Sequence, residues 1–140
     1  MNFTHIYLKK VFKSQEYLEA AKKCADVIWT RGLLKKGYGL CHGISGNAYA
    51  FLAMYQETGD EEYLKKVKRF CNFVCDYGKH QCRTPDRPFS LFEGMSGTVY
   101  FLDDMEKSIE DARFPCFYLQ GRRNLFKIGC AKSKTPLEKS

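Results

Sequence analysis

Two adjacent residues, Cys41 and His42, have the side chains best suited to chemistry in this sequence of 140 residues. A thiolate and an imidazole are both common zinc ligands, and the pair precedes the start of an expected helix, where the helix dipole favours a thiolate. Zinc takes three protein ligands in catalytic sites and four in structural sites. No CxxC or HxxxH pair supplies the others. From spacing alone, the favoured interpretation is therefore a buried cysteine beside a helix-capping histidine.

A second group of charged residues lies in the segment HQCRTPDRPFSLF, residues 80–92, whose two prolines exclude a helix interior. By local pattern, Arg83 and Asp86 are an ordinary pair of surface residues in a turn. Glu93 follows this segment at the position that corresponds to His42, where it could cap its helix or reach the site. We interpret it as a packing or capping residue.

The apolar spacing predicts four helices that would position these residues. They are expected near residues 14–31, 46–57, 60–77 and 97–107. The first and third are amphipathic and are interpreted as outer helices, whereas the second and fourth are mostly apolar and are interpreted as inner helices. Each outer helix is expected to form a hairpin with the inner helix that follows it.

The four helices form an internal repeat. The outer helices match at an offset of 46 residues, since Tyr17 corresponds to Tyr63. The inner turns HGISGNAY and EGMSGTVY match at an offset of 51 residues. Their paired glycines allow positive φ and a close backbone approach, and the turns are expected to present free N–H groups at the helix N-termini. The sequence thus predicts an all-α fold of about two hairpins, as a piece of a larger helical toroid or solenoid or as a shortened form of one.

Composition supports a single globular unit, because 44% hydrophobic and 15% aromatic residues exclude intrinsic disorder. In residues 120–140, six basic residues and one acidic residue supply +5 of the formal charge of +7. Seven cysteines without disulfide spacing favour a reducing compartment, and no apolar run of 18 residues or signal peptide is evident. We expect a soluble cytoplasmic protein, with the peripheral plasma membrane or nucleus as alternatives. A nucleic-acid partner is not expected.

Three long motifs resemble the C-terminal part of the eukaryotic lanthionine synthetase C-like (LanC-like) proteins. They are LLKKGYGLCHGISGNAYAFL, YGKHQCRTPDRPFSLFEGMSGTVYFL and ARFPCFYL, within a resemblance that runs from Lys10 to Leu119. The resemblance implies an α/α toroid, of which residues 1–119 would be the C-terminal part. Residues 120–140 would be a divergent basic tail, for which a membrane or an acidic partner is conceivable.

The resemblance also implies a zinc ion held by two cysteines and one histidine. Cys41 and His42 match two of these ligands, and the other cysteine would belong to an earlier repeat, upstream of this chain. Glutathione recognition is implied as well, and the chemistry is suitable because a tripeptide with two carboxylates and an ammonium needs fixed cations and an anion. The matching residues are Lys36, Arg83, Thr84, Pro85 and Asp86.

Such a site would add a thiol to the β-carbon of a dehydroalanine or dehydrobutyrine, a peptide modification that forms a thioether. In the eukaryotic type, glutathione would be added to proteins that have lost a phosphate by elimination. No residue of this sequence is identified as the proton donor. The sequence leaves two functions open: a truncated, glutathione-utilising lanthionine synthase domain, or a noncatalytic fragment with a binding or regulatory role.

Overall fold

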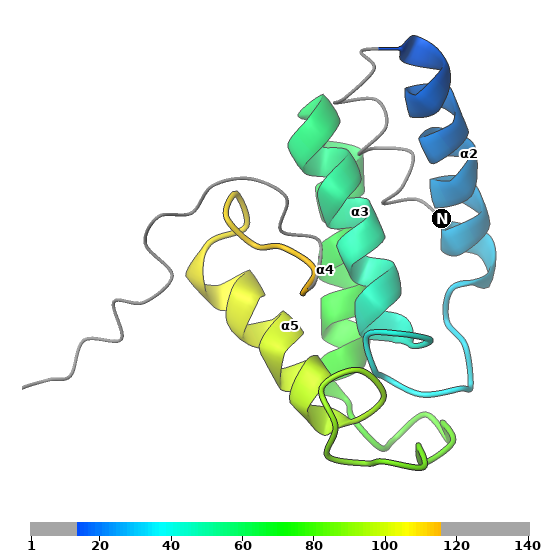
Figure 1. Ribbon diagram of the computed structural model, residues 1–140, viewed down its shortest axis with the longest axis vertical. Helices are drawn as coiled ribbons and strands as arrows, with labels where there is room; N and C mark the ends of the chain where they lie inside the picture. Colours follow the sequence, from blue (N-terminus) through cyan, green and yellow to red (C-terminus); the bar gives the residue numbers. More distant parts are fainter. Residues whose placement is uncertain (1–13, 116–140) are drawn as a thin grey trace, which may run out of the picture.

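The computed structural model describes residues 14–115, which form four helices and no strand (Figure 1). The helices are α2 (Gln15–Arg31), α3 (Ile44–Thr58), α4 (Glu61–Cys75) and α5 (Met95–Lys107). The all-α prediction is confirmed, and both inner helices begin two residues earlier than expected. None of these helices is long and apolar enough to cross a membrane. The basic tail expected at 120–140 lies outside the described residues.

Helix α3 packs most extensively against α4, and less against α2 and α5. The connection from α3 to α4 has only two residues, Gly59 and Asp60. Gly59 adopts the left-handed conformation with φ of 70°, and the Asp60 carboxylate caps α4 by accepting a hydrogen bond from the Glu62 amide at 3.0 Å. The sequence predicted a hairpin of α2 with α3, and these helices are in contact, but α3 packs more extensively against α4, to which the shorter connection joins it.

The core surrounds α3, which is buried on almost all sides, as expected of an inner helix. Phe51 of α3 packs edge to face against Phe70 of α4, and Trp29 of α2 contacts both rings. Helix α5 differs from the expectation of a second inner helix, since Met95 and Val99 are exposed. Only one side of α5 is therefore covered by the described residues.

The internal repeat is visible in the backbone contacts before each inner helix. The amide of Ile44 donates to the carbonyl of Gly37 at 3.2 Å, and the amide of Met95 donates to the carbonyl of Pro88 at 2.7 Å. The two donors are 51 residues apart in the sequence, and so are the two acceptors. The sequence repeat thus corresponds to two turns with the same hydrogen bond.

The glycines of these turns serve close approach rather than positive φ. A Cβ atom on Gly46 would collide with the Leu40 carbonyl, and one on Gly97 would collide with the Leu91 carbonyl, again at an offset of 51 residues. Gly46 and Gly97 are both helical. The close backbone approach expected of the paired glycines is confirmed at Gly46 and Gly97, and neither of them has a positive φ.

The expectation of free N–H groups at the start of α3 was wrong. The amides of Ile44, Ser45 and Gly46 donate to the carbonyl oxygens of residues 37–39 at distances of 3.2–3.3 Å. The preceding loop folds back over the helix N-terminus, so these amide groups are not available to bind an anion.

Candidate functional site

Two loops from different repeats meet at one end of the molecule (Figure 1). Residues 32–43 connect α2 to α3, and residues 76–94 connect α4 to α5. The amide of Arg83 donates to the Lys35 carbonyl at 2.7 Å. The amides of Leu40 and Cys41 both donate to the Phe92 carbonyl, at 2.7 and 3.0 Å. These three hydrogen bonds hold the loops together, so residues of both repeats shape a common surface.

Gly39 permits this contact between the two loops. A Cβ atom at residue 39 would collide with the carbonyl groups of Phe92 and Glu93. Any other residue would push the loops apart next to Cys41. The glycine therefore determines how closely the first repeat approaches the second.

Tyr38 fixes the start of the second loop. Its side chain is buried, and its hydroxyl oxygen accepts hydrogen bonds from the amides of Gly78 and His80 at 3.2 and 3.4 Å. Its ring also lies against that of Tyr77, with centroids 4.5 Å apart. Burial raises the pKa of the Tyr38 hydroxyl, so it remains protonated and uncharged. Through these contacts a residue of the first loop holds the segment that leads to Arg83.

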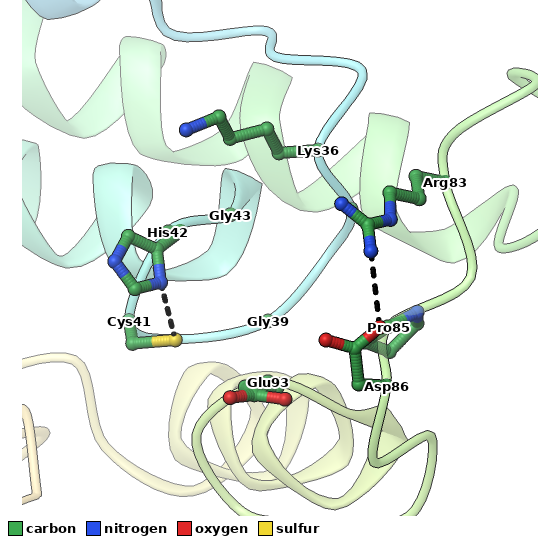
Figure 2. A pocket seen from close by; sticks show the side chains of 10 residues that line it. Lys36, Gly39, Cys41, His42, Gly43, Arg83, Pro85, Asp86 and Glu93 are labelled. Carbon is green, nitrogen blue, oxygen red and sulfur yellow. Dashed lines mark hydrogen bonds and ion pairs between the residues drawn. The ribbon is translucent and has the colours of Figure 1, made fainter.

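Between the two loops lies a pocket of about 240 Å³ (Figure 2). Six of the seven site residues expected from the sequence line it, and only Thr84 does not. Glycines and Glu93 complete the wall. The lining residues are Lys36, Gly37, Gly39, Cys41, His42, Gly43, Arg83, Pro85, Asp86 and Glu93.

Cys41 and His42 are both exposed, and the Cys41 Sγ lies 2.9 Å from the His42 Nδ1. The N-cap of α3 is Gly43, and no side chain caps this helix. The interpretation from spacing alone, a buried cysteine beside a capping histidine, was therefore wrong. Both side chains instead face the pocket, where a thiol and an imidazole are in direct contact.

This pair has suitable donor chemistry for zinc, which binds cysteine sulfur and histidine nitrogen. Within residues 14–115, however, no group of three or more His, Cys, Asp or Glu side chains is arranged to hold a metal ion. Among the described residues, the pocket thus brings together one cysteine and one histidine of metal-ligating type.

The pocket contains two cations and two anions. Arg83 and Asp86 form an ion pair with Nη2–Oδ1 at 3.0 Å, and their side chains are 71% and 82% exposed. An ion pair this exposed stabilises the protein by at most about 1 kcal/mol, so a ligand can compete for either member. Glu93 was expected to pack or to cap α5, but it is exposed in the pocket wall. The sequence feature that indicated a place in the pocket for Glu93 was its correspondence to His42 in the repeat.

The described residues form two helical repeats, and the loops of both repeats together build one pocket that contains a thiol and an imidazole. These features define the chain as part of a helical repeat protein. The family model described as "Lanthionine synthetase C-like protein" matches residues 2–119. The chain belongs to this family.

Two relatives extend the comparison. A Danio rerio protein named "Glutathione S-transferase LANCL1" is 58% identical over 108 residues, which cover 77% of this chain and 26% of that protein. An Arabidopsis thaliana protein named "LanC-like protein GCL1" is 36% identical over 107 residues, covering 74% of this chain and 24% of that protein. The chain thus spans about a quarter of the length of these relatives.

Proposed function

We propose that this chain forms part of a zinc-dependent, glutathione-binding site that adds a thiol to dehydroamino acids in peptides. The observation on which the proposal rests is the pocket between the two loops, because it gathers a thiol and imidazole pair with two cations. The name of the Danio rerio relative, a glutathione S-transferase, supports the same class of ligand.

In this proposal Cys41 and His42 are two ligands of a zinc ion whose coordination is completed by a group outside the described residues. When bound, zinc would lower the pKa of a coordinated thiol so that it is a thiolate at neutral pH. The 2.9 Å contact between the two side chains keeps both donors at the same side of the pocket.

Lys36 and Arg83 are proposed to bind the two carboxylates of glutathione. Arg83 offers a planar pair of donors that matches a carboxylate, whereas Lys36 is a mobile point charge from the other loop. Pro85 restricts the loop between Arg83 and Asp86, which lowers the conformational entropy lost on binding. Held at both ends, the tripeptide would direct its thiol toward Cys41 and His42.

The alternative function is a noncatalytic fragment with a binding or regulatory role. It is favoured by one observation, that no group of three or more potential metal-ligating side chains is found among the described residues. The two functions share the pocket and differ in whether a metal is bound.

Calorimetric titration of glutathione into the 140-residue chain tests the proposal. Lys36→Ala is expected to weaken binding by about fivefold, the size expected for loss of one exposed ion pair. Lys35→Ala is the matched control, because Lys35 is the adjacent exposed lysine and does not line the pocket. Absence of glutathione binding by the wild-type chain, or equal losses for the two variants, would contradict the proposal.

A further inference from the structure

The two carboxylates of the pocket have different surroundings. Asp86 is paired with Arg83 at 3.0 Å, three residues away in the same loop. No hydrogen bond or ion pair is found for the Glu93 carboxylate among the described residues. In Figure 2, Glu93 lies between the Cys41 side of the pocket and the Arg83–Asp86 side. One anion is therefore engaged within the loop, and the other is available to a ligand.

We infer that Glu93 binds the ammonium group of the ligand, and that Asp86 is a positioning residue that orients Arg83. This inference rests on the proposed function, and it identifies the ligand as zwitterionic, with two carboxylates and one ammonium. It assigns the ammonium to a residue different from Asp86, the anion suggested by the sequence.

Charge matching supports the assignment of the ammonium to Glu93. Glutathione presents two carboxylates and one ammonium, and Lys36 and Arg83 meet the carboxylates. The ammonium then requires an anion. Asp86 already shares its charge with Arg83 through Oδ1, whereas the Glu93 carboxylate has no partner among the described residues and can give both oxygens to the ammonium.

The backbone of Glu93 is well placed for such a contact. Its amide donates to the Ser90 Oγ at 3.2 Å, and its carbonyl lies against Gly39 of the other loop. Glu93 directly precedes Gly94 at the N-cap of α5, as His42 directly precedes Gly43 at the N-cap of α3. Residues at the same position of the two repeats thus line the same pocket, one with an imidazole and one with a carboxylate.

The test compares two ligands, glutathione and glutaryl-cysteinylglycine, which is the same tripeptide without its amino group. Binding of each to the 140-residue chain is measured by calorimetric titration. The wild-type chain is expected to bind glutathione about fivefold more tightly than the deaminated peptide. Glu93→Gln should abolish this preference, and Glu106→Gln, an exposed glutamate of α5 outside the pocket, should retain it.

The variant Asp86→Asn separates positioning from direct contact. It is expected to weaken the binding of both ligands by the same factor, and this effect should disappear when Arg83→Ala is also present. Circular dichroism of each variant verifies that the helices remain folded.

Three results would overturn the inference. If Glu93→Gln keeps the preference for glutathione, or if Asp86→Asn abolishes it, Glu93 does not bind the ammonium, although the proposed function stands. If the wild-type chain binds neither ligand, the proposed function fails together with the inference.

Discussion

The amide of Cys41 donates a 3.0 Å hydrogen bond to the carbonyl of Phe92, the residue that occupies the same position in the second repeat. Because equivalent positions of the two repeats are in direct contact, the pocket lies along their junction. Cys41 and His42 come from one side of the junction, and Glu93 comes from the other. The described site therefore depends on both repeats being packed together.

The close approach at Gly97 is expected to be essential for this packing. Gly97→Ala should lower the free energy of unfolding by about 2 kcal/mol, since the added methyl group would meet the Leu91 carbonyl and the Leu40 side chain. Val99→Ala, at an exposed position of the same helix, should change it by less than about 0.5 kcal/mol. Urea unfolding followed by circular dichroism provides both values. Equal effects would show that the glycine is not required.

The two serines of the repeated turns should respond differently to alanine. Ser96 Oγ donates to the Phe89 carbonyl at 2.6 Å, whereas the buried Ser45 Oγ has no hydrogen-bond partner among the described residues. Ser96→Ala should therefore cost about 1 kcal/mol, and Ser45→Ala should be neutral or stabilising, because an unpaired buried hydroxyl is unfavourable. Thermal unfolding of the two variants measures the difference. A larger loss for Ser45→Ala would contradict this account.

Stability is expected to fall in alkaline solution through Cys71. Burial, with a smaller effect of Cys75, raises the pKa of the Cys71 thiol to about 11. An unfolded cysteine has a pKa of about 8.5, so the unfolded chain loses the proton first. The contribution of the protonated Cys71 thiol to the free energy of unfolding is complete below a pH of about 8.5 and is lost as the pH rises toward 11. Urea unfolding across this range should show a steeper decline for wild type than for Cys71→Ala. Equal slopes would exclude Cys71 as a cause.

Helix periodicity and the offset repeats were sufficient to predict the four helices and their two copies. They did not predict that α3 packs closest to α4, because a repeat pattern states which segments are equivalent and not which are adjacent. The length of the Gly59–Asp60 connection was the available signal, since two residues can only join helices that lie side by side.

The site was predicted less completely than the fold. The LanC-like resemblance indicated six residues that line the pocket, but spacing alone assigned Cys41 to the core and His42 to a cap. The exposure of this pair follows from the hydrogen bonds of Leu40 and Cys41 to Phe92. These bonds join residues that are far apart in the sequence, by 52 and 51 positions. Glu93 was assigned to packing or capping rather than to the site for the same reason, because its position depends on that contact and not on its neighbours in sequence.

Zinc is expected to bind the 140-residue chain far more weakly than a three-ligand site would, because ligand number determines the affinity. Metal analysis after dialysis against a chelator should find much less than one zinc per chain. Stoichiometric zinc would contradict this expectation, and Cys41→Ala should then release it. Cys75→Ala is the matched control, because Cys75 is an exposed cysteine of α4 that does not line the pocket.

The central claim is that the pocket at the junction of the two repeats binds glutathione, and Arg83 tests it most directly. Calorimetric titration of glutathione should give an affinity about tenfold lower for Arg83→Ala than for wild type, as expected when a charged hydrogen-bonding partner is removed. Arg87→Ala, an exposed arginine of the same loop outside the pocket, should bind as wild type does. Equal affinities for wild type and Arg83→Ala would contradict the claim and leave the loop with a purely structural role.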